Sequence, residues 1–181
     1  MTEWLVSLPH DIKMLYEAAA DQDLARGARE VAVGAIISTI GQGHLPGVPP
    51  DDFSNYCDSA ILLRMALQRI VAIGGEDAET LRSRFDGFFA SLDEDLALCR
   101  EAIGDRYEWL EQKLERLPTL TYKGKKIADY LDDDDASAFL YEEGLEFRTE
   151  YEVDEDLLGD RLKKAQTILD ALDKRRQSET R

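Results

Sequence analysis

The chain has 181 residues, of which 44% are hydrophobic and 33% charged, a composition that excludes wholesale disorder and suits one domain with a substantial core. Its formal net charge is −16, from 22 basic and 38 acidic residues. This balance argues against binding to nucleic acid or anionic membrane, because phosphate groups attract clustered Lys and Arg. A basic protein partner or a metal cation is the more natural ligand.

The N-terminus lacks the basic and apolar regions of a signal peptide, and no apolar run reaches the roughly 18 residues of a membrane-spanning helix. We therefore expect a cytoplasmic protein without a membrane span.

Helical spacing of apolar residues predicts three helices in the first 75 residues. A short one covers about 9–20, with Pro9 in its first turn. The second covers 24–40, ends at Gly41 and Gly43, and is so rich in small residues that it should pack closely on its neighbours. The third, about 55–73, is apolar on nearly every side of a helical wheel and should form the centre of the core.

A stripe of apolar residues at intervals of three and four continues from residue 81 to residue 117. An unbroken helix here would span about 60 Å, longer than a compact domain of this size needs. We therefore expect a break near Gly104, with Gly87 as a second candidate kink. The stripe could form an intramolecular core or the seam of a homodimer, and periodicity does not separate the two.

After Pro118 the pattern changes. Residues 119–122 predict a short strand followed by a turn at 123–125, and the alternation over 145–153 predicts a second strand. Between them Asp132 to Asp135 can begin a helical turn, and Asp154 can cap a last helix. The basic end, 174–181, should be frayed.

These elements predict a mainly α fold in one structural domain. Residues 1–117 would form a helical bundle, and 118–181 an acidic appendage of a small β-hairpin and a C-terminal helix packed on it.

Three runs, residues 28–35, 45–51 and 57–62, resemble the YkvA-like family, the domain of unknown function 1232, and the resemblance covers about 25–75. By that resemblance Asp51 matches the family's loop acid and Asp58 the first of its paired helix aspartates. Ser59 stands where the second is expected. The resemblance implies a small helical bacterial domain and carries no established chemistry.

The loop over 44–58 contains the candidate metal ligands Asp51, Asp52, Asp58 and His44. Carboxylate oxygens and an imidazole could hold a divalent cation, which would indicate a metal-binding protein or a metal-dependent hydrolase. In the alternative interpretation, the aspartates are turn and cap residues. No catalytic motif such as HExxH, a P-loop or GxSxG occurs, so we expect no enzymatic activity and no cofactor beyond that cation.

Residues 129–160 contain fourteen Asp or Glu and a single basic residue, Arg148. Such a run is either a solvated face or an electrostatic docking surface for a basic protein. The docking hypothesis assigns partner binding to Asp132, Asp133, Asp134, Asp135, Glu142 and Glu143. It makes a non-enzymatic interaction or regulatory module the leading function, ahead of the metal hypothesis.

Overall fold

A computed structural model describes residues 1–50, 52–151, 158 and 165–180. The described part is mainly helical, as predicted, with one two-stranded antiparallel hairpin. Among these residues, no helix combines the length and the apolar character needed to cross a bilayer.

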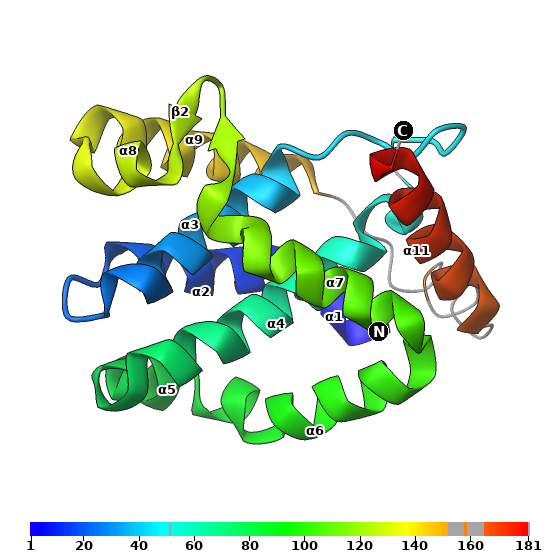
Figure 1. The fold of residues 1–181 in the computed structure, drawn as a ribbon, viewed down its shortest axis with the longest axis horizontal. Helices are drawn as coiled ribbons and strands as arrows, with labels where there is room; N and C mark the ends of the chain where they lie inside the picture. Colours follow the sequence, from blue (N-terminus) through cyan, green and yellow to red (C-terminus); the bar gives the residue numbers. More distant parts are fainter. Residues whose placement is uncertain (51, 152–157, 159–164, 181) are drawn as a thin grey trace.

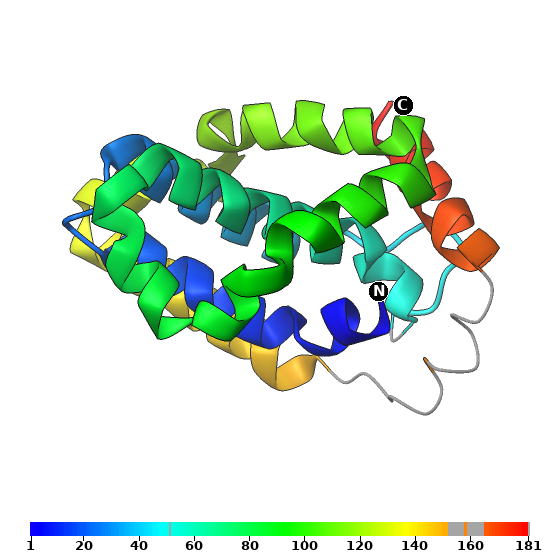
Figure 2. The same ribbon diagram turned by 90° about the horizontal axis from the view of Figure 1, so that it is seen from below.

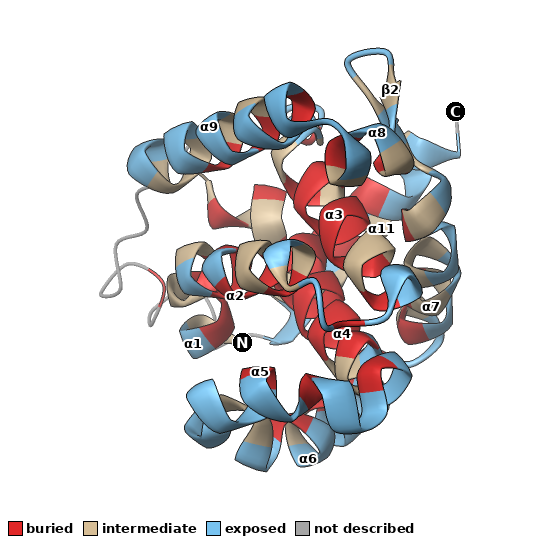
Figure 3. Ribbon diagram, turned by 90° about the vertical axis from the view of Figure 1, so that its left-hand side faces the viewer, coloured by how far each residue is buried: buried red, intermediate tan, exposed pale blue. Residues whose placement is uncertain are grey.

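The N-terminal helices are α1 (Thr2–Val6), α2 (Leu8–Ala20) and α3 (Arg26–Ile40). A loop and a 3-10 helix, η1 (Phe53–Tyr56), lead into α4 (Cys57–Gly74), which is buried at every position from 57 to 67. The helix α4 is thus the predicted centre of the core, and Figure 3 shows it largely red beside the equally buried α3. Both cysteines are buried free thiols.

The small residues of α3 allow the predicted close packing. A Cβ added at Gly34 would lie 2.6 Å from the carbonyl carbon of Leu117, so only glycine lets the backbone of η3 (Leu117–Thr119) approach this closely.

The stripe over 81–117 is divided between helices. After η2 (Gly75–Ala78) come α5 (Glu79–Arg84), α6 (Asp86–Ile103) and α7 (Asp105–Arg116). The predicted break is at Gly104, whose φ of 60° is a backbone conformation that glycine adopts freely. The second break falls at Phe85 rather than at Gly87. Both α6 and α7 pack against α4 of the same chain, so much of the stripe forms intramolecular core.

The C-terminal third contains the hairpin β1 (Thr121–Tyr122) and β2 (Lys125–Lys126), then α8 (Ile127–Asp132) and α9 (Asp134–Glu150). The first strand and turn are where the sequence predicts them. The predicted strand over 145–153 is wrong as far as Glu150, because these residues continue α9. Asp133 caps α9 by accepting the N–H groups of Asp135 and Ala136.

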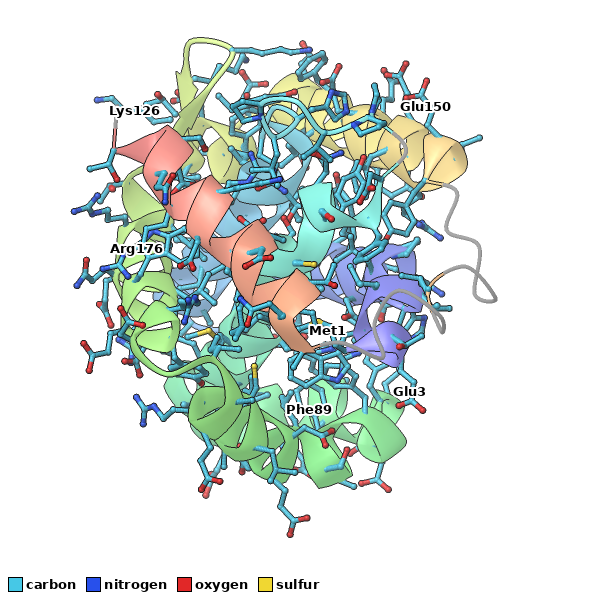
Figure 4. The ribbon with its side chains drawn as sticks, turned by 90° about the vertical axis from the view of Figure 1, so that its right-hand side faces the viewer. Met1, Glu3, Phe89, Lys126, Glu150 and Arg176 are labelled. Carbon is cyan, nitrogen blue, oxygen red and sulfur yellow. The ribbon has the colours of Figure 1, made fainter. Side chains whose placement is uncertain are left out.

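The last helix, α11 (Ala165–Glu179), lies across the beginning of α4 and beside α7 (Figure 4). The prediction of fraying from 174 is wrong, since the helix continues to Glu179 and Arg175 is buried. The predicted Asp154 cap lies outside the described residues. On the far side of the core, α8 and α9 pack on α3 and α2 (Figure 1), and Figure 2 places α9 and α7 on opposite sides of the molecule. One hydrophobic cluster joins residues of 1–117 to residues of 118–181.

Candidate functional site

The loop before α4 is organised by the buried side chain of Asn55. Its Oδ1 accepts the N–H of Leu45 at 2.8 Å, and its Nδ2 donates to the carbonyl of Pro49 at 2.7 Å. Asp52 caps η1 by accepting the N–H of Ser54 at 2.9 Å. Asp52 therefore fills the cap role that the sequence allowed for it.

Asp58 lies in a partly buried ionic cluster made of Asp58, Lys113, Arg175 and Glu179, here called the Asp58 cluster. Lys113 Nζ is 3.0 Å from Asp58 Oδ2 and 2.7 Å from Glu179 Oε1, while Arg175 Nε is 3.5 Å from Asp58 Oδ1. Burial alone would lower the pKa of Lys113, but Asp58 and Glu179 outweigh it and raise that pKa above its ordinary value. The cluster joins α4, α7 and α11.

Arg175 also fixes the loop. Its Nη1 donates to the carbonyl of Gly43 at 2.7 Å and its Nη2 to the carbonyl of Asn55 at 2.8 Å. An arginine of the last helix thereby satisfies two carbonyls of the loop that contains the predicted metal ligands.

The four predicted metal ligands have separate surroundings. Asp58 is paired with two cations, Asp52 caps η1, His44 is exposed on the loop, and Asp51 lies outside the described residues. Within the described ranges, no three His, Cys, Asp or Glu side chains gather as a metal site would require. Metal binding at this loop stays a prediction.

Three of the predicted partner-binding acids are engaged within the chain. Both oxygens of Asp132 accept from Arg26, at 2.9 and 2.7 Å; Asp133 lies 3.4 Å from Lys125 Nζ; and Glu143 accepts from Lys123 and from the Tyr122 hydroxyl. The pKa of each carboxyl is lowered, chiefly by hydrogen bonds to its carboxylate. Asp132 ties α8 to α3, whereas Asp133 and Glu143 tie the start and the middle of α9 to the hairpin.

The other three, Asp134, Asp135 and Glu142, are exposed and make no ion pair in the part of the chain that the structure describes. All lie on α9, where Glu146 and Glu150 are exposed as well. Figure 3 shows pale blue along much of α9. Asp135, Glu142, Glu146 and Glu150 follow one another at helical spacing and form one edge of the helix.

Beside this acidic edge are Tyr141, 51% exposed, and Leu145, 47% exposed, one helical turn apart. The set is called the α9 outer face: Asp134, Asp135, Ala138, Tyr141, Glu142, Leu145, Glu146 and Glu150. Sequence reasoning missed Leu145, Glu146 and Glu150, because an alternating strand was assigned over 145–153, where the structure continues the helix, and without that helix Tyr141 had no exposed partner one turn on.

No protein-family model matches the chain, and searches of curated proteins and of solved structures found no similar protein. The resemblance to the YkvA-like family therefore stays a prediction.

Proposed function

We propose that the chain is a non-enzymatic protein-interaction module, and that the α9 outer face binds a basic, amphipathic helix of a partner protein. The observation that carries the proposal is the exposure of Tyr141 and Leu145 next to an edge of carboxylates. Among the described residues, only Ile73 and Leu98 are other large hydrophobic side chains with comparable exposure, and neither lies on α9.

The two components of this face have different physical effects. Burying Tyr141 and Leu145 removes apolar surface from water and supplies affinity. The carboxylates speed the approach of a cationic partner and fix its orientation, an effect that salt screens. A helix that presents Leu on one side and Lys or Arg along its margin complements both, in the manner of a helix packed on a helix.

A second copy of this chain would be a poor occupant, because its own α9 outer face carries the same negative charge. The proposal also places the protein in the cytoplasm. The buried free thiols of Cys57 and Cys99 support a reducing compartment.

The first experiment titrates the protein with three synthetic peptides and follows binding by calorimetry. One is a helical peptide of Leu and Lys with an apolar face, the second replaces each Lys with Glu, and the third is oligolysine. We expect the Leu-Lys peptide to bind most tightly, because it alone matches the face in both charge and apolar contact. Equal affinity for oligolysine would contradict the proposal.

The double variant Tyr141→Ser with Leu145→Ser should weaken binding of the Leu-Lys peptide by about tenfold or more, since two exposed apolar contacts are lost. The matched control is Ile73→Ser with Leu98→Ser, which removes the two other exposed hydrophobic side chains from α4 and α6. Equal losses in the two double variants would show that the peptide does not use α9.

A further inference from the structure

A groove of about 800 Å³ lies between α2, α3, α8 and α9 and reaches the exposed residues Asp134, Tyr141 and Glu142 of α9. Its volume is within the range typical of small-molecule sites. Tyr16, Val33, Leu131 and Leu140 contribute apolar wall. The groove is bridged at one point, where the hydroxyl of Tyr16 donates to the carbonyl of Leu140 at 2.5 Å.

Three cationic side chains line this groove although acids greatly outnumber bases in the chain. They are Lys13 of α2, Arg29 of α3 and Arg148 of α9. None of the three forms an ion pair within the described residues, whereas Arg26 and Arg84 nearby each pair with a carboxylate. Cations without counterions, converging from three helices, indicate a place for an anion.

Arg148 gives this indication most directly. Its Nε is buried and has no hydrogen-bond partner. A buried donor without an acceptor costs about 1–3 kcal/mol, so Arg148 is held at the groove wall without a compensating partner. Arg29 is held in place in another way. Its Nε donates to the carbonyl of Ala19 at 2.9 Å, which fixes the guanidinium at the end of α2.

Three carboxylates also line the groove and bear on the charge of the ligand. Glu17 is neutralised by Arg84 at 2.5 Å, which leaves Asp134 and Glu142. Against three cations, two carboxylates leave a positive excess, in contrast to the net charge of −16 for the whole chain.

We propose that this groove binds a small amphipathic organic anion, with its acid group at Lys13 and Arg148 and its apolar body along Tyr16 and Val33. Lys13 precedes Tyr16 by one turn of α2, and the charge of Arg148 acts on Tyr16, which places both cations near the same end of the groove. A medium-chain carboxylate has this chemistry. The groove borders the α9 outer face, and Asp134, Ala138, Tyr141 and Glu142 belong to both, whereas Lys13, Tyr16, Val33 and Arg148 belong to the groove alone.

The test compares octanoate, octylamine and 1-octanol, which share an apolar chain and differ in the charge of the head group. Calorimetry with the intact chain, below the concentration at which octanoate forms micelles, should give saturable one-site binding of octanoate alone. Equal binding of all three compounds would mean that the groove is only apolar, and no binding of octanoate would overturn the proposal.

Two charge variants assign the binding to the groove. Lys13→Gln and Arg148→Gln should each weaken octanoate binding by about tenfold, because each removes a charge-assisted contact. Lys174→Gln, which removes an exposed cation of α11, should leave it unchanged. If all three variants lose affinity equally, octanoate responds to overall charge and the groove is not its site.

A further readout separates ligand binding from structural support. Because Arg148 carries an unsatisfied buried donor, Arg148→Gln should leave the melting temperature of the ligand-free protein unchanged or raised while octanoate binding falls. A lowered melting temperature with octanoate affinity retained would make Arg148 a structural residue. Lys13→Gln lies on α2, outside the α9 outer face, and should weaken octanoate binding while leaving the Leu-Lys peptide bound, so the two proposals fail separately.

Discussion

Asp11 is a fully buried carboxyl at the contact of α1, α2, α4 and α6. Its Oδ2 lies 3.3 Å from Arg64 Nε, and Arg64 in turn donates to the Ser7 hydroxyl at 2.7 Å. The guanidinium also sits 4.7 Å from the ring centroid of Trp4 and 4.9 Å from that of Phe88. Burial raises the pKa of Asp11 to about 7, against the opposing effect of the Arg64 charge.

This pKa makes stability depend on pH in a defined direction. Between pH 3.8 and about 7 the folded chain keeps a proton on Asp11 that the unfolded chain has released. The stability that Asp11 contributes is therefore fully present below pH 3.8 and is lost as the pH rises to about 7. Asp11→Asn removes it, so the free energy of unfolding of the wild type, relative to that variant, should fall from pH 4 to pH 7 in urea titrations. A difference that stays constant across this range would contradict the assignment.

The ion pairs of the Asp58 cluster predict that Asp58→Asn destabilises the protein even when no metal is present. Asp58→Asn leaves the half-buried Lys113 and the buried Arg175 without their shared counterion and should lower the free energy of unfolding by about 3–5 kcal/mol. Glu179→Gln, at the exposed rim of the same cluster, should cost at most about 1 kcal/mol. Urea denaturation in EDTA tests both, and a destabilisation by Asp58→Asn that appears only when metal is present would support the metal hypothesis instead.

At the scale of elements, the close approach of α3 to η3 rests on one position. Gly34→Ala would place its Cβ 2.6 Å from the Leu117 carbonyl carbon, where backbone must move, and should destabilise the protein by about 1–3 kcal/mol. Gly27→Ala in the same helix meets nothing within 4 Å and should be neutral or stabilising by up to about 1 kcal/mol. Thermal melts of the two variants compare packing with helix propensity, and equal effects would refute the packing argument.

From α2 to Arg116 most helices follow closely from the sequence, because their apolar intervals have no competing period, but α1 and the break at Phe85 were not predicted. The Gly104 break was also predictable, from length and from the only glycine near the middle of the stripe. Residues 145–153 were misassigned because two periods overlap there. Leu145, Phe147 and Tyr151 alternate with charged residues, but Ala136, Leu140, Gly144 and Phe147 also continue a helical interval, and tertiary packing on α2 and α3 favours the helix.

The candidate site was less predictable than the fold, because its chemistry depends on pairs far apart in the chain. Asp58 looked like a free ligand until Arg175 and Lys113 were placed beside it. Arg175 in turn looked like part of a frayed basic end. The groove cations Lys13, Arg29 and Arg148 show no pattern in sequence, since only the packing of three helices brings them to one groove.

At the scale of the whole molecule, the net charge of −16 gives salt two opposite effects. Screening reduces the repulsion among carboxylates in the free protein, so moderate salt should raise its melting temperature. The same screening should weaken the Leu-Lys peptide on the α9 outer face. Salt should therefore raise the melting temperature while it lowers the affinity for the peptide. Weaker binding in salt is then due to screening of the α9 outer face and not to unfolding.

If α9 binds a basic partner through its exposed carboxylates, as proposed above, then reversing the charge of that helix should sharply weaken binding. Glu142→Lys with Glu146→Lys changes the α9 outer face, while Glu94→Lys with Glu101→Lys makes the same change in net charge at exposed positions of α6. Titrated with the Leu-Lys peptide at low salt, the α9 variant should lose at least about tenfold in affinity and most of the salt dependence, and the α6 variant should lose little. Equal losses in the two would contradict the account, because the peptide would then respond to net charge alone.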